Sequence, residues 1–91
     1  MRIDLYLSTT GLVKRRTVAR EFCDAGKVKL NGKTAKPGKE VKTGDELALS
    51  LSSGRKVIEI TDIPTKSIRK NEGENYYKLK EFEPKQRKQG F

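Results

Sequence analysis

A run of cationic side chains, Lys14-Arg15-Arg16, stands directly before a predicted helix start at Thr17. Thr is a favoured helix N-cap because its hydroxyl accepts a hydrogen bond from an N–H group of the first turn. The remaining N–H groups of that turn, at the positive end of the helix dipole, favour anions. Arg20 follows one turn later, and a guanidinium group can hold a phosphate through two hydrogen bonds. These residues therefore predict a phosphate-binding corner.

The excess of positive charge is concentrated in the same part of the chain. The sequence has 21 Lys and Arg against 12 Asp and Glu, a net charge of +9. Residues 14–42 hold ten of the basic residues and three of the acidic ones. Such an excess points to a polyanionic partner, either nucleic acid or an anionic membrane. Solvation of an ordinary surface is the alternative, and for single lysines such as Lys29 or Lys42 it is the better explanation.

Catalytic and metal chemistry have few residues available. The sequence has no His and one Cys, which excludes an internal disulfide and nearly every transition-metal site. We find no acid–base pair and no Gly-rich phosphate loop, so we expect no enzyme, no cofactor and no metal. Cys23 lies among apolar residues and is expected to be a small core residue.

A membrane location is not supported by the sequence. No apolar run reaches 18 residues, and no segment pairs a wide apolar face with a basic one. The first residues lack the apolar stretch of a signal peptide. We therefore expect a protein of the reducing cytoplasm that does not contact membranes.

Two helices are expected to carry the basic cluster. The spacing of Ile3, Tyr6 and Leu7 places them on one face of a helix over residues 3–11. A second helix is expected over residues 17–25. Its apolar stripe consists of Val18, Ala19, Phe22 and Cys23, and Gly26 is expected to end it with a positive φ.

Strands are expected between residues 28 and 63. Asn31-Gly32 is typical of a two-residue hairpin turn, and Leu47, Leu49 and Leu51 alternate with polar residues. We therefore predict an α+β domain over residues 1–63. Residues 64–83 are expected to form a linker and a short closing segment, in which Tyr76, Tyr77 and Leu79 form one short strand that docks on the domain. Residues 84–91 are expected to be a basic, disordered tail.

The order of these segments resembles the RNA-binding domain first named for ribosomal protein S4, over residues 1 to about 50. The motifs that carry the resemblance are Arg2-Ile3-Asp4, Lys14-Arg15-Arg16-Thr17-Val18-Ala19, Asp24-Ala25-Gly26-Lys27-Val28-Lys29-Leu30-Asn31-Gly32, Ala35-Lys36-Pro37-Gly38 and Val41-Lys42-Thr43-Gly44-Asp45-Glu46-Leu47. The resemblance implies two helices plus a β-hairpin, the alpha-L motif, packed on a small, strongly bent antiparallel sheet. It also implies that the second helix and the loop before it meet RNA backbone.

Within that group the sequence looks most like the RqcP family of bacterial ribosome-associated quality control. The run Lys14-Arg15-Arg16-Thr17-Val18-Ala19-Arg20-Glu21 and the segment Asn75-Tyr76-Tyr77 carry this resemblance. It implies a non-catalytic, monomeric factor that binds large-subunit rRNA and peptidyl-tRNA on obstructed large ribosomal subunits. It also implies support of the partner RqcH, which adds C-terminal alanine tails to the stalled chain without mRNA.

The resemblance carries Arg2, Asp4 and Arg16 over as functional positions, with Lys14 and Arg15 as weaker transfers. Asp4 is expected to orient the guanidinium group of Arg2. The full set of expected RNA contacts is Arg2, Asp4, Lys14, Arg15, Arg16, Thr17, Arg20 and Lys36.

Three alternatives stay open at the level of sequence. One is the related heat-shock family that recycles free large subunits with nascent chains, because the segment Lys85-Gln86-Arg87-Lys88 is unusually basic. Another is a general rRNA-binding or ribosome-assembly protein. The third is DNA binding, since phosphate contacts alone do not separate DNA from RNA.

Overall fold

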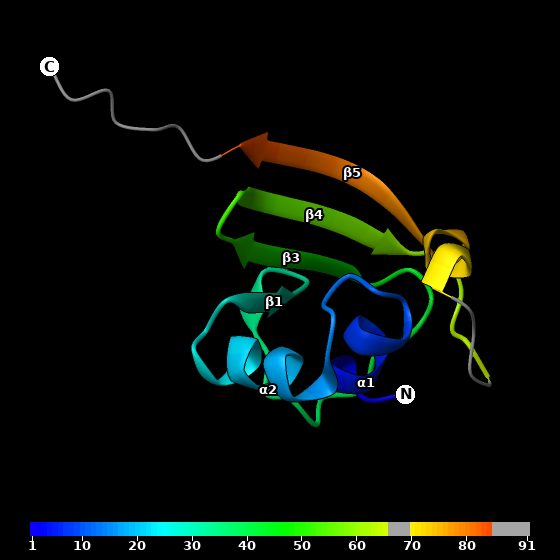
Figure 1. Cartoon of the computed structure of the whole chain (residues 1–91), viewed down its shortest axis with the longest axis horizontal. Helices are drawn as coiled ribbons and strands as arrows, with labels where there is room; N and C mark the ends of the chain where they lie inside the picture. The colour runs from blue at the N-terminus through cyan, green and yellow to red at the C-terminus, as the bar shows by residue number, and fades with distance from the viewer. Residues whose placement is uncertain (66–69, 85–91) are drawn as a thin grey trace, which may run out of the picture.

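The structure, a computed structural model, describes residues 1–65 and 70–84. Two helices come first and a sheet follows, interrupted by one 3₁₀ helix. The elements are α1 (Ile3–Thr9), α2 (Arg16–Asp24), β1 (Val28–Leu30), β2 (Lys33–Thr34), β3 (Glu46–Leu51), β4 (Gly54–Ile60), η1 (Lys70–Tyr76) and β5 (Tyr77–Pro84). The five strands pair antiparallel in the order β2-β1-β3-β4-β5. Figure 1 shows α1 and α2 together near β1, with β5 at the far edge of the sheet. The predicted α+β class is confirmed.

Helix α1 buries the three apolar residues that the spacing placed on one face. Ile3, Tyr6 and Leu7 have no exposed surface and pack in one core with Leu47, Leu49, Ile58 and Ile60 of the sheet. The helix ends at Thr9 instead of residue 11. The chain turns at Gly11, whose φ is +78°, and the N–H of Val13 then donates to the carbonyl of Leu7 at 3.0 Å.

Helix α2 begins one residue earlier than predicted, and Thr17 is not its N-cap. The N-cap is Arg15, in extended backbone and without a side-chain capping bond, so the Thr17 assignment was wrong. Val13, in the segment that leads into the helix, is buried. Because Arg16 also ion-pairs with α1, we infer that tertiary packing sets this helix start in place of local capping.

The end of α2 is the glycine-dependent stop that the sequence indicated. Gly26 has a φ of +74° and donates to the carbonyl of Cys23 at 3.0 Å. The N–H of Lys27 donates to the carbonyl of Phe22 at 2.9 Å. These two bonds are those of a Schellman motif, in which a left-handed residue satisfies the last carbonyls of a helix. The helix ends at Asp24, one residue before the expected limit.

The β1–β2 hairpin turns at Asn31-Gly32, as the sequence indicated. Asn31 and Gly32 have φ of +51° and +85°, and Leu30 pairs with Lys33. Positive φ at both central residues gives the turn the twist that the flanking strands need. The side chain of Asn31 also accepts a hydrogen bond from the N–H of Glu46 at 2.9 Å and donates to Asp45 at 3.2 Å. The turn is thereby tied to the start of β3.

The closing segment forms more structure than the short strand that was expected. Strand β5 pairs with β4 from Tyr77 to Pro84, with a register shift that leaves Lys80 as the extra residue of a β-bulge. Pro84 therefore ends a strand and does not begin a tail. The rest of the expected tail, 85–91, lies outside the described residues. The proposed division into a domain at 1–63 and a closing segment at 64–83 stays a prediction.

Helix η1 is linked to α1 and to the chain after β4 through the carbonyl of its last residue, Tyr76. The carbonyl of Tyr76 accepts hydrogen bonds from the Tyr6 hydroxyl at 2.7 Å and from the N–H groups of Thr61 and Asp62 at 3.0 and 3.1 Å. Gly73 is buried against Thr10, and a Cβ atom at this position would overlap the Thr10 carbonyl oxygen. Burial raises the pKa of the Tyr6 phenol, with Tyr77 and Asp62 adding to the shift.

Candidate RNA interface

A buried carboxylate joins two arginines at the starts of the two helices. Asp4 Oδ2 lies 3.2 Å from Arg2 Nη2 and 3.5 Å from Arg16 Nε. The Asp4 side chain has no exposed surface, whereas those of Arg2 and Arg16 are 46% and 48% exposed. The second carboxylate oxygen, Oδ1, accepts a hydrogen bond from the N–H of Leu5 at 2.7 Å. We call Arg2, Asp4 and Arg16 the arginine corner.

The arginine corner keeps a positive charge and many free donors. A guanidinium group has five N–H donors, of which Asp4 occupies a part. Because Asp4 is inaccessible, an approaching anion meets the two half-exposed cations and not the carboxylate that holds them. A buried charge is tolerated only when it is paired, and here two cations and one backbone N–H pair it. The arrangement therefore fixes the two guanidinium groups at the surface in a preset orientation.

The loop after β2 holds the start of α1 in place. The N–H of Ile3 donates to the carbonyl of Lys39 at 2.7 Å, and the N–H of Asp4 donates to that of Pro37 at 3.3 Å. These bonds satisfy two N–H groups that the helix itself leaves unpaired. The N-terminal Met1 ammonium pairs with Glu40 at 3.2 Å on the same loop.

Only Lys36 of this loop was expected from the sequence to contact RNA, and Pro37-Gly38 was noted as part of the family resemblance. Gly38 faces the Arg2 guanidinium group: a Cβ atom on Gly38 would lie 3.8 Å from Arg2 Nη2. The useful signal was Gly38, because a glycine presents backbone without a side chain. The sequence alone gave no reason to place it against α1.

The other predicted contacts lie on two sides of the arginine corner. Lys14, Arg15, Thr17 and Arg20 are exposed in the loop before α2 and in its first turns, and Lys36 is exposed on the loop after β2. The four cations among them form no ion pair with any residue in the described ranges. Since no side chain caps α2, the first-turn N–H groups face outward beside these cations. The structure thus joins Arg2, Asp4 and Arg16 directly and leaves the others as flanking charges.

Comparisons with known proteins agree on one family. A model of the S4 domain matches residues 1–47. The RQC P-site tRNA stabilizing factor of Halalkalibacterium halodurans is 40% identical over 84 residues, which cover 92% of this chain and 94% of the relative. The protein of the same name from Helicobacter pylori is 52% identical over 65 residues, 71% of this chain and 77% of the relative. The chain belongs to this family. The resemblance to the RqcP family, read from the sequence, is confirmed.

A solved structure extends the comparison to the fold. Vibrio cholerae Heat Shock Protein 15, described as trimeric, superposes with a TM-score of 0.82 at 31% identity, covering 88% of this chain and 81% of the other. The expected similarity to a heat-shock family is therefore real at the level of fold. The matched S4 domain contains the complete arginine corner and both helices.

No membrane-spanning helix and no metal-binding cluster occurs among residues 1–65 and 70–84. No helix in these ranges is long and apolar enough to cross a membrane. In the same ranges, no three or more His, Cys, Asp or Glu side chains are grouped so that they could hold a metal ion. The relatives are named as P-site tRNA stabilizing factors.

Proposed function

We propose that this chain is a non-catalytic RNA-binding factor of bacterial ribosome-associated quality control. It binds the P-site tRNA and adjacent large-subunit rRNA on obstructed large ribosomal subunits in the cytoplasm. Two kinds of evidence support this: the family to which the chain belongs and the positive surface around α2. The observation that carries the proposal is the buried Asp4 carboxylate that positions Arg2 and Arg16.

The arginine corner is suited to the backbone of a folded RNA. Two guanidinium groups held in fixed directions lose less conformational entropy on binding than two free side chains would. Each can offer paired N–H donors to a phosphate. Arg15, Lys14 and Arg20 add long-range attraction that does not require exact placement. RNA backbone contacts of this kind give affinity and orientation, while the ribosome supplies the location.

The finer parts of the function follow from the family resemblance. By holding the peptidyl-tRNA in place, the factor would support a partner of the RqcH type, which extends the stalled chain with alanine. The chain would do this as a monomer, since a net charge of +9 opposes self-association.

A second candidate is supported by a separate observation. The close match to Heat Shock Protein 15 in fold fits a factor that recycles free large subunits carrying nascent chains. The two functions differ in their effect on the addition of C-terminal alanine tails. In a reconstituted reaction with obstructed large subunits and an RqcH-type factor, the first proposal expects alanine addition to increase when this chain is present. Unchanged alanine addition, with binding to large subunits intact, would favour the recycling function.

The electrostatic part of the proposal has its own test. If the surface neutralises about five phosphates, log affinity should fall with log salt at a slope of about −3.5 to −4.5. Filter binding of the full chain to large subunits over a range of salt measures this slope. A slope near zero would contradict a surface that works through phosphate contacts.

A further inference from the structure

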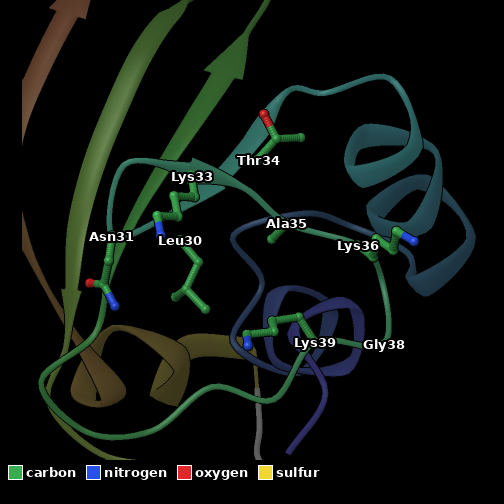
Figure 2. Close-up of a pocket in the computed structure, with 8 residues that line it drawn as sticks. All are labelled: Leu30, Asn31, Lys33, Thr34, Ala35, Lys36, Gly38 and Lys39. Atoms are coloured by element: carbon green, nitrogen blue, oxygen red, sulfur yellow. The ribbon is translucent and has the colours of Figure 1, made fainter.

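An open groove lies beside the arginine corner, between the β1–β2 hairpin and the loop after β2. Its volume is about 750 Å³, within the range of pockets that hold small organic groups. The lining residues are Leu30, Asn31, Lys33, Thr34, Ala35, Lys36, Gly38 and Lys39. Figure 2 shows Lys33 and Lys39 reaching toward the Leu30 side chain from opposite walls, whereas Lys36 points away from it.

The floor of the groove is apolar and its rim is cationic. Leu30 and Ala35 form the floor with the aliphatic parts of the lysine side chains. Lys33 and Lys39 are exposed and form no ion pair with any residue that the structure describes. The nearby Glu40 is directed to the Met1 ammonium group instead. A ligand that fits this groove must therefore combine an apolar, compact body with negative charge at its edges.

Both walls of the groove are held in place without a ligand. On the hairpin side, Asn31 is hydrogen-bonded to Glu46 and to the buried Asp45. On the loop side, the carbonyls of Pro37 and Lys39 accept hydrogen bonds from the start of α1. Pre-formed walls reduce the ordering cost of binding, as in most small-ligand sites.

The groove is continuous with the arginine corner. Gly38 lines the groove and is also the residue that faces the Arg2 guanidinium group. An RNA strand whose phosphate is held by Arg2 therefore has its neighbouring nucleotide at the rim of the groove. An unpaired base is flat and largely apolar on its faces, and its flanking phosphates are anionic, which matches floor and rim.

We propose that this groove takes the base of an unpaired nucleotide in the bound RNA, with Lys33 and Lys39 contacting the flanking phosphates. This inference rests on the proposed RNA-binding function and adds a contact to the base. RNA is recognised in single-stranded regions by removing bases from the stack and burying them, as a groove of this shape permits. An acidic, apolar peptide is the competing occupant, and the test below separates the two.

The experiment compares two probes and two variants of the full chain. The probes are a short oligouridylate and an abasic strand with the same number of phosphates. The first variant, Lys33→Met with Lys39→Met, keeps the aliphatic stems and removes both charges. The control, Lys29→Met with Lys78→Met, removes the same charge at exposed positions outside the groove. Lys29 alternates with the buried Val28 and Leu30, so it lies on the other face of the hairpin.

Fluorescence anisotropy should show the parent binding oligouridylate about tenfold more tightly than the abasic strand. The groove variant should bind oligouridylate several-fold more weakly than the parent and have a salt slope shallower by about 1.4, since each single-strand phosphate contact contributes about 0.7. The control should keep the parent's affinity and salt slope. Methyl resonances of Leu30 and Ala35 should shift with oligouridylate and much less with the abasic strand.

Three results would overturn the inference. One is equal affinity of the parent for the two strands, and another is identical behaviour of the groove variant and the control. The third is a shift of the Leu30 and Ala35 methyl resonances with an oligopeptide of alternating Glu and Leu but not with oligouridylate. Large-subunit binding measured in parallel keeps the two proposals apart: if it persists and depends on Arg16, only the groove inference fails.

Discussion

Arg16 Nε lies 3.5 Å from Oδ2 of Asp4, and the Asp4 carboxylate is completely shielded from solvent. One residue belongs to the first turn of α1 and the other is the first residue of α2. The ion pair therefore sets the position of one helix start against the other. It also means that the acidic residue nearest to the proposed RNA surface is inaccessible to RNA. Its role is to hold cations in place.

Replacing Arg16 tests whether geometry matters beyond charge. Arg16→Lys keeps the charge but presents a single ammonium group, which cannot reach Asp4 and a phosphate with the same fork of donors. We expect Arg16→Ala to weaken large-subunit binding by about tenfold and Arg16→Lys to recover only part of it. Co-sedimentation measures both. Arg55→Ala, at an exposed site on β4, is the matched loss of charge and should bind nearly as the parent does. Full recovery by lysine would show that charge alone suffices.

Gly73 should be intolerant of even one added carbon. A Cβ atom there would overlap the Thr10 carbonyl oxygen, which belongs to backbone and cannot move aside. Gly73→Ala should therefore release η1 from α1 and loosen β5, which follows directly after η1, while α1 and α2 stay folded. Hydrogen exchange should report faster exchange at residues 77–84. Gly38→Ala is the control, because its new Cβ would make only ordinary contacts, at 3.8 Å or more. Unchanged protection in Gly73→Ala would refute this close packing.

Cys23 should contribute to a loss of stability at high pH. Burial raises the pKa of its thiol from 9.0 to about 11, with the carboxylates of Asp4 and Asp24 adding to the shift. Between these values the unfolded chain releases the proton while the folded chain keeps it, so stability falls as pH rises from 9 through 11. Cys23→Ala lacks this contribution, although it leaves a small cavity at every pH. Urea unfolding should show a smaller drop from pH 8 to pH 11 in the variant. Parallel pH profiles would count against a buried thiol.

Phe22 is less buried than its place in the apolar stripe of α2 suggested. It packs against the core but remains partly exposed, and Lys27 Nζ lies 5.5 Å from its ring centroid. Phe22→Ala is therefore expected to lower the free energy of unfolding by about 1–3 kcal/mol, less than the 3–5 kcal/mol of a fully buried Phe. Chemical denaturation measures it. A loss above 4 kcal/mol would show that the ring is deeper in the core than this structure places it.

Local signals in the sequence were sufficient for much of the fold. The stop at Gly26, the turn at Asn31-Gly32 and the alternation of Leu47 and Leu49 each depend on neighbouring residues, and each is found. Thr17 shows the limit of such signals. Its propensity to cap a helix was real, but the start of α2 depends on the distant Asp4, which local propensity does not contain.

The candidate site was predictable in its residues but not in its construction. Arg2, Asp4 and Arg16 were singled out together from the family resemblance, and the structure brings them together. The full burial of Asp4 and the position of Gly38 facing Arg2 were not foreseen. Both depend on how the loop after β2 packs under α1, a contact between segments about 35 residues apart that no periodicity reveals.

Asp4→Asn is the most direct test of the claim that a buried carboxylate positions the RNA-binding arginines. The change keeps the shape of the side chain and raises the net charge by one, so simple charge counting expects tighter binding. We expect weaker binding, because an amide does not hold two guanidinium groups and its NH₂ group would oppose their donors. Glu21→Gln, an exposed acidic site on α2, provides the same gain in charge and should bind as well as the parent or better.

Co-sedimentation with obstructed large subunits, on samples whose folding is checked by circular dichroism, gives the answer. Asp4 is buried, so some stability will be lost, and the measurement is made well below the melting temperature of the variant. We predict that folded Asp4→Asn binds at least several-fold more weakly than the parent while Glu21→Gln does not. Binding of Asp4→Asn equal to or tighter than that of the parent would contradict the account and reduce the arginine corner to a patch of positive charge.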